Sequence, residues 1–149
     1  MYLNIVTDDE LLVSQVVKFI LMLILVITII FNLFKSIKAV SSTRKIINIF
    51  LFLSFSVALY FVIREFRIEG ALLEHPVYVE GTTIGYCSVF ARGTGIEFEY
   101  ELGGKKYKRC NTFYPVPKDS IQVPGGKYKV RCSEKFRDSG RMIFTKRNS

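Results

Sequence analysis

Two long runs of hydrophobic residues near the start of the chain constrain its fold more than any other feature. The first run, Leu11 to Phe34, holds 24 residues, and Lys18 is its only ionisable group. The second run, Ile46 to Ile63, holds 18 residues and no charge. At about 1.5 Å per residue they form helices of roughly 36 and 27 Å, enough to cross a bilayer. We predict two transmembrane helices, with Lys18 near enough to one end to snorkel to the interface.

A cleaved signal peptide is the alternative explanation for the first run. Such a peptide starts with a basic region and ends at a cleavage site of small residues. This chain starts with MYLNIVTDDE, which carries three acids and no base. We therefore expect residues 1–10 to be an N-terminal tail and residues 11–63 to stay in the protein as a helical hairpin.

The eleven residues between the two runs determine the expected orientation of the hairpin. They hold no acid and four basic side chains, which are Lys35, Lys38, Arg44 and Lys45. Basic loops face the cytoplasm in most membrane proteins. We therefore expect this loop on the cytoplasmic side of the membrane, with both chain termini outside the cytoplasm.

Polar side chains are few within the two runs. Asn32 and Asn48 fall at similar depths beside the basic loop, so their amides either bond across the hairpin or reach interfacial water. The runs contain no carboxylate and no Gly or Pro. These features favour an anchor over a conduction path.

After residue 63 the chain becomes polar, and the hydrophobic period changes to the two-residue period of strands. We expect residues 64–81 to be a juxtamembrane linker and residues 82–149 a small, mostly antiparallel β domain, barrel-like or sandwich-like. The fold class is then an α+β membrane protein. The expected strands are Thr82 to Phe90, Gly95 to Leu102, Lys105 to Phe113, Lys127 to Ser133 and Met142 to Thr145.

The segment IEFEYELGGKKYKRC gives the sharpest local prediction. Gly103 and Gly104 suit a two-residue type I′ turn, which pairs Leu102 with Lys105 and each residue before Leu102 with the next one after Lys105. Cross-strand partners share a face of the sheet. The expected core face holds Ile96, Phe98, Tyr100 and Tyr107, and the opposite face holds two Glu–Lys pairs, Glu101 with Lys106 and Glu99 with Lys108.

Residues 82–145 resemble a group of small bacterial membrane proteins that carry one or two membrane helices and a C-terminal β domain of unknown function. The resemblance depends on eight positions, which are Gly104, Lys105, Tyr107, Val123, Gly126, Tyr128, Val130 and Ser139. The group has Asn-Pro before the final Ser, whereas this chain has Phe136-Arg137-Asp138. The resemblance implies a small β fold and a bacterial membrane location, and it carries over no catalytic residues.

Residues that commonly support catalysis or bind metals are scarce. His75 is the only histidine, and the chain holds no phosphate-binding glycine loop, no dinucleotide fingerprint and no H-E-x-x-H motif. We therefore expect no enzymatic activity, no cofactor and no metal. The three cysteines, Cys87, Cys110 and Cys132, match no compact zinc pattern. We expect them to be buried and unpaired, and we expect that, if a disulfide forms, it joins Cys87 to Cys132.

Positive charge is concentrated in the last third of the chain, where residues 105–149 hold thirteen basic and three acidic side chains. Strand alternation places Lys127, Lys129 and Arg131 on an outer face, opposite Tyr128, Val130 and Cys132. The expected basic face, which binds a partner or lipid, consists of Lys127, Lys129, Arg131, Lys135, Arg137 and Arg141. Nucleic acid is disfavoured because Tyr107 and Tyr128 are expected to point inward and cannot stack on bases.

These expectations favour a membrane-anchored interaction module, such as an accessory subunit of an envelope complex or an immunity-type inhibitor. The expected partners are membrane lipid and either another protein or a second copy of the chain. The alternative is a membrane-perturbing or pore-related protein that acts through an oligomer of its helical hairpin.

Overall fold

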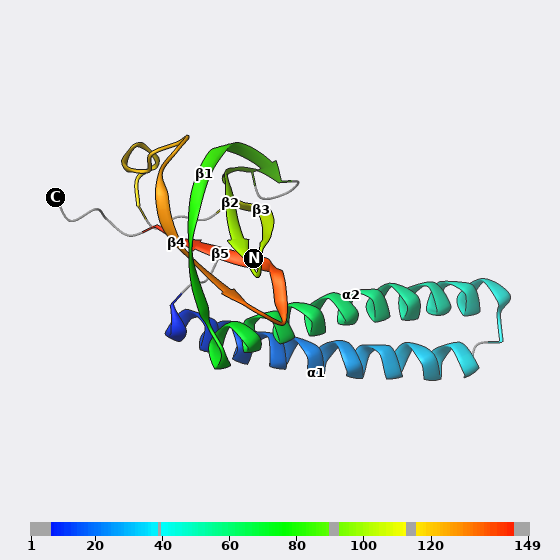
Figure 1. Cartoon of the computed structure of the whole chain (residues 1–149). Helices are drawn as coiled ribbons and strands as arrows, with labels where there is room; N and C mark the ends of the chain where they lie inside the picture. Colours follow the sequence, from blue (N-terminus) through cyan, green and yellow to red (C-terminus); the bar gives the residue numbers. More distant parts are fainter. Residues whose placement is uncertain (1–6, 39, 90–92, 113–115, 145–149) are drawn as a thin grey trace. The chain divides into compact units, whose positions relative to one another are not determined.

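A computed structural model describes residues 7–38, 40–89, 93–112 and 116–144 (Figure 1). The chain forms two compact units, one made of residues 12–69 and the other of residues 1–11 together with 70–149. The helices are α1 (Asp8–Lys38) and α2 (Ser42–Glu74). The remaining elements are β1 (Val77–Val89), β2 (Gly93–Leu102), β3 (Lys105–Asn111), the short 3-10 helix η1 (Lys118–Ser120), β4 (Lys127–Ser133) and β5 (Phe136–Ile143).

Helix α1 begins at a capping box. The backbone N–H of Glu10 donates to the hydroxyl of Thr7, and the backbone N–H of Thr7 donates to the Glu10 carboxylate. Three acids occupy the first turn, and Lys35 and Lys38 occupy the last turn. These charges match the helix dipole at both ends, so local sequence defines where α1 starts and stops.

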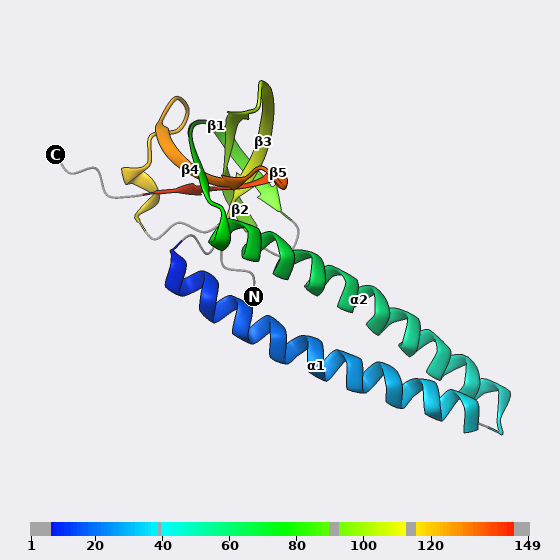
Figure 2. The ribbon, with the colours of Figure 1, turned by 60° about the horizontal axis from the view of Figure 1, so that its bottom comes forward.

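Helices α1 and α2 run side by side as an antiparallel pair (Figures 1 and 2). Both are long and apolar enough to cross a membrane, by length and composition. Few side chains in their most apolar stretches are buried, and Ile27 is 66% and Phe50 68% exposed. The core helix of a soluble protein would instead bury most of this surface. The structure thus contains the two apolar helices that the sequence predicts.

The second helix is longer than its hydrophobic run. It continues to Glu74, and β1 starts at Val77, so the expected juxtamembrane linker, residues 64–81, consists mostly of helix and strand. The added turns read REFRIEGALLE, and Ile68 and Leu72, four residues apart, are both buried. Residues four apart lie on the same face of a helix. This spacing continues the helix past Ile63, where the continuous apolar run ends.

The five strands form one strongly curled antiparallel sheet in the order β3-β2-β1-β4-β5. Its two end strands come close together, since the side-chain amide of Asn111 on β3 donates to the carbonyl of Met142 on β5 at 3.3 Å. The sheet is therefore nearly closed, which agrees with the expected barrel-like form and differs from a two-sheet sandwich. Strand β4 has its expected bounds, whereas β1 starts five residues before Thr82 and β5 starts six residues before Met142.

The pairing of β2 with β3 confirms the predicted register, with Leu102 opposite Lys105 and Tyr100 opposite Tyr107. Ile96, Phe98 and Tyr100 are buried in the core, and Tyr107 packs against it. The ion pairs on the outer face are diagonal rather than directly opposite as predicted. They join Lys106 to Glu99 at 3.3 Å and Lys108 to Glu97 at 3.0 Å.

Tyr100 ties β2 to β5 through the barrel interior. Its hydroxyl donates to the carbonyl of Arg137 at 2.5 Å and accepts from the backbone N–H of Gly140 at 2.9 Å. A Cβ at Gly140 would lie 2.5 Å from the Tyr100 ring, so only glycine fits there. Burial raises the pKa of Tyr100 to about 12, which keeps the hydroxyl protonated and able to donate.

Candidate functional site

The six residues of the expected basic face do not share one surface. Lys127, Lys129, Lys135 and Arg137 are exposed, whereas Arg131 and Arg141 are 3% and 8% exposed. Lys127 pairs with Glu80 on β1 at 2.8 Å, and this contact raises the pKa of Lys127. The exposed part of the basic face is therefore limited to Lys127 and Lys129 on β4 and to Lys135 and Arg137 around the turn between β4 and β5.

Arg131 is a structural residue rather than a surface contact. It follows the predicted alternation with Lys127 and Lys129, yet its guanidinium donates twice to the carbonyl of Leu72, at 3.0 and 2.8 Å, and pairs with Asp8 at 2.6 Å. The first turn of α1 and the last turn of α2 therefore cover this part of β4. Alternation distinguishes the two faces of a strand but does not show what covers the outer face.

The carbonyl that Arg131 caps lies in the last turn of α2, where helix carbonyls lack partners within the helix. A basic side chain at this end also matches the negative end of the helix dipole. Arg141 sits directly opposite Arg131 on β5. These two arginines thus belong to the packing of the β domain, and the expectation that they are exposed on its basic face is wrong.

The helical hairpin contains a polar cluster that sequence reasoning missed. The ammonium of Lys18 on α1 lies 2.5 Å from the Glu69 carboxylate on α2, and the hydroxyl of Ser14 donates to that carboxylate at 2.9 Å. The side chains of Lys18 and Glu69 are 9% and 2% exposed. Lys18 therefore does not snorkel to water, because it is paired between the helices. The spacing of Ser14 and Lys18, one helical turn apart, was an available signal.

Glu69 places a buried carboxylate between the two helices, which the sequence did not predict. The uncharged run ends at Ile63, so the sequence indicated no buried carboxylate between the helices. Because α2 continues to Glu74, Glu69 faces α1 and is buried. A buried ion pair must compensate the large cost of removing both charges from water, and here the Ser14 hydroxyl supplies an additional hydrogen bond.

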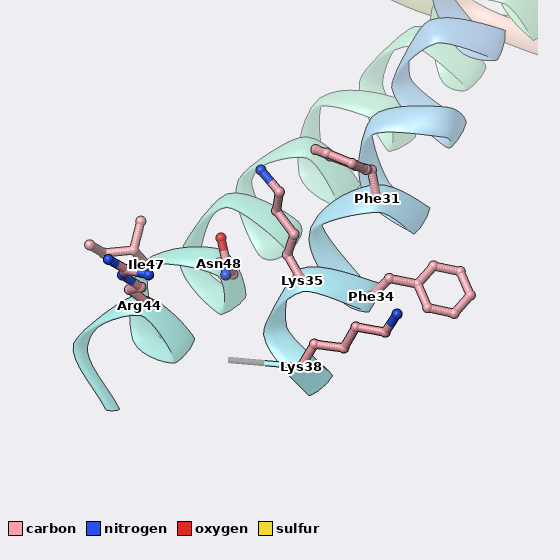
Figure 3. A pocket seen from close by; sticks show the side chains of 7 residues that line it. All are labelled: Phe31, Phe34, Lys35, Lys38, Arg44, Ile47 and Asn48. Atoms are coloured by element: carbon pink, nitrogen blue, oxygen red, sulfur yellow. The ribbon is translucent and has the colours of Figure 1, made fainter. Parts of the chain in front are cut away.

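A pocket of about 510 Å³ lies at the tip of the hairpin, where α1 ends and α2 begins (Figure 3). Its lining combines three cations with aromatic, aliphatic and amide side chains, namely Lys35, Lys38, Arg44, Phe31, Phe34, Ile47 and Asn48. The ammonium of Lys35 lies 4.4 Å from the centre of the Phe31 ring, a cation–π distance. The side-chain amide of Asn32 donates to the carbonyl of Thr28 in its own helix at 2.8 Å, a bond that the sequence did not predict.

The cysteine predictions are wrong for two of the three residues. Cys87 on β1 and Cys110 on β3 form a disulfide with a Cα–Cα distance of 6.0 Å, and Cys132 is the free, buried thiol. The Cys132 thiol donates to the carbonyl of Val77, and burial raises its pKa. A thiol with a raised pKa forms the nucleophilic thiolate less readily than an exposed cysteine does.

A β-bulge in β1 explains the unexpected disulfide. The register shifts between Thr83 and Gly85, and the residues after this bulge point to the opposite face from that predicted by simple alternation. Cys87 therefore pairs with Gly95 on the same outer face that carries Cys110 opposite Glu97. A Cβ at Gly95 would lie 2.9 Å from the sulfur of Cys110, so glycine leaves space for the bridge to pass over β2.

Within the described ranges, no group of three or more His, Cys, Asp or Glu side chains could hold a metal ion. His75 is exposed after the end of α2. The described residues place cations at the hairpin tip and on the exposed parts of β4 and β5. The order of two apolar helices followed by a β domain is compatible with the group that the sequence resembles. Comparison with protein-family models, curated proteins and solved structures gives no match for this chain.

Proposed function

We propose that this protein is a membrane-anchored binding module of the bacterial inner membrane, with its β domain outside the cytoplasm and in contact with a protein partner. The Cys87–Cys110 disulfide is the observation that carries this proposal. Disulfides persist in oxidising compartments and are rare in the cytoplasm. The basic loop between α1 and α2 supports the same orientation independently, because such loops favour the cytoplasmic side.

The bonding of polar side chains in the hairpin favours an anchor over a pore. A pore-forming oligomer needs polar side chains that face a shared, water-filled lumen. Here the hydroxyl or amide groups of Thr28, Asn32, Ser54 and Ser56 donate to carbonyls of their own helices, one turn earlier. Ser14 and Lys18 both bond to the Glu69 carboxylate within one hairpin.

Three exposed cations of the β domain, Lys129, Lys135 and Arg137, are the proposed partner contacts. Charged groups at the rim of an interface raise the association rate and select acidic partners. The proposed partner is therefore a protein with an acidic surface. The proposal assigns no reaction to the chain.

Cysteine labelling in intact bacterial cells tests the orientation. Lys135→Cys places a thiol on the β domain, and Ser41→Cys places one in the loop between the helices. The natural cysteines give little background, because two are bridged and Cys132 is buried. We expect a membrane-impermeant maleimide to label position 135 in intact cells and position 41 only after permeabilisation. The opposite pattern would refute the orientation.

Co-purification from crosslinked cells tests the binding role. The triple variant K129Q/K135Q/R137Q should recover at least about tenfold less of any stoichiometric partner than wild type. The control, K105Q/K106Q/K108Q, removes the same charge from β3 and should recover the partner normally. Recovery of the chain alone, together with ion leakage from liposomes, would favour the pore-related alternative.

A further inference from the structure

The tip of the helical hairpin carries four positive charges and no carboxylate. Lys35 and Lys38 end α1, and Arg44 and Lys45 lie in the first turn of α2, which contains no acid. The sequence holds no Asp or Glu between Glu10 and Glu65. At about 1.5 Å per residue, Glu65 lies roughly 30 Å along α2 from Lys45. These four cations therefore lack a carboxylate partner within reach along either helix.

The first turn of α2 adds to this imbalance. The N-terminal end of a helix carries partial positive charge, which acids in the first turn normally offset. Here Arg44 and Lys45 occupy that turn, so charge and dipole have the same sign. The combination is relieved when an anion from outside the chain sits near the helix ends.

The pocket between these helix ends is amphipathic as well as cationic. Figure 3 shows Lys35 and Asn48 between the two helices, Lys38 and Phe34 at the end of α1, and Arg44 with Ile47 on α2. Phe31 and Phe34 line the pocket and are more than half exposed, and Figure 3 shows the Phe34 ring extending from α1 away from α2. A free inorganic anion would use the cations but would leave this apolar surface in water. A ligand with both a phosphate and a hydrocarbon part would cover both kinds of surface.

We propose that this tip pocket binds the headgroup of an anionic phospholipid. The phosphate lies against Lys35, Lys38 and Arg44, and the first carbons of the acyl chains lie against Phe31, Phe34 and Ile47. Basic pockets between membrane helices on the cytoplasmic side suit such headgroups. The inference requires that the hairpin lies in a membrane, but it does not depend on the proposed protein partner of the β domain.

The test is a lipid titration of the full chain in detergent, followed by native mass spectrometry. The probes are phosphatidylglycerol and phosphatidylcholine with identical acyl chains. We expect at least about tenfold tighter binding of phosphatidylglycerol, because only this lipid has net negative charge. Equal binding of the two lipids would overturn the proposal, and so would displacement of phosphatidylglycerol by millimolar inorganic phosphate.

Matched variants separate the pocket from the general charge of the tip. Lys38 lines the pocket and Lys45 does not, yet both are exposed and belong to the same loop region. Each cation near an anionic lipid contributes about fivefold in affinity, so K38Q should weaken binding about fivefold and K35Q/K38Q/R44Q roughly a hundredfold. K45Q should leave binding within about twofold of wild type, and K38R should restore it. Equal losses for K38Q and K45Q would overturn the assignment. Circular dichroism of each variant confirms that the helices remain folded.

Discussion

The helical hairpin and the β domain differ in the burial of their hydrophobic side chains. Ile27 in α1 is 66% exposed, whereas Ile96 in β2 is fully buried. The hairpin leaves most of its apolar side chains on its surface, and the β domain gathers its own into one core. The two regions therefore differ in where they place apolar side chains, and each region needs a different test.

The two regions also differ in the burial of their ion pairs. In the hairpin, Lys18 and Glu69 pair where both side chains are almost fully buried. In the β domain, Lys106 and Glu99 pair on an outer face where both are largely exposed. Burial strengthens the coupling between two charges and raises the cost of losing one of them. The same substitution should thus have different effects in the two regions.

Aromatic truncation should show the largest difference. Tyr100→Ala removes a buried ring and two hydrogen bonds from the barrel, so we expect it to lower the free energy of unfolding of the β domain by about 3–5 kcal/mol. Denaturant unfolding monitored by near-ultraviolet circular dichroism measures this loss. The control, Phe61→Ala in α2, truncates a ring that is 52% exposed and should change the same quantity by less than about 0.5 kcal/mol. Similar losses would refute the contrast in burial.

Breaking the buried ion pair should have a comparable effect within the hairpin. Glu69→Ala leaves the Lys18 ammonium without its carboxylate, and we expect a loss of about 3–5 kcal/mol in helix pairing. Interhelical distance measured between labels during titration with a denaturing detergent reports this equilibrium. The double variant Lys18→Met/Glu69→Leu should recover most of the stability, because it removes both charges and keeps the packing. A double variant no better than Glu69→Ala would contradict this account.

Removing the disulfide should destabilise the β domain alone. The bridge closes a loop between residues 87 and 110, 23 residues apart, so we expect C87S/C110S to lower unfolding free energy by about 3 kcal/mol. Wild type in reducing agent should lose the same amount, and the variant should not respond to reductant. A wild type insensitive to reductant, with normal unfolding of C87S/C110S, would show that the bridge is not formed.

Alkaline pH should weaken the β domain through Tyr100. Its pKa is raised from 10.0 to about 12 in the folded state, so the folded state favours the neutral hydroxyl. That contribution is complete below pH 10 and is lost as pH rises from 10 to 12. Tyr100→Phe cannot ionise, so its unfolding free energy should fall less over this interval. Parallel pH profiles for the two proteins would contradict the burial of the hydroxyl.

Surface ion pairs should give the smallest effect. Lys106→Ala removes a pair that is open to water, and we expect a loss below about 1 kcal/mol, which falls further at high salt. Denaturant unfolding at low and high salt measures it. A loss as large as that of Glu69→Ala would show that exposure does not separate the two regions.

The sequence predicted features that depend on local patterns. The type I′ turn at Gly103 and Gly104 determines the register of β2 and β3, and this register is confirmed. The apolar runs likewise predicted both helices. The sequence did not predict features that depend on long-range geometry. The bulge near Gly85 changes the face that Cys87 occupies, and the ends of the helices bury Arg131. Neither event alters the period of hydrophobicity near these residues.

Accessibility of spin labels in proteoliposomes tests the central claim most directly. Labels at Ile27→Cys and Val57→Cys report on the exposed apolar sides of α1 and α2, and a label at Lys129→Cys reports on the β domain. If lipid surrounds the hairpin, the first two labels should relax faster with oxygen than with a water-soluble nickel chelate, and the third should show the reverse. Strong relaxation of the hairpin labels by the nickel chelate would contradict the account.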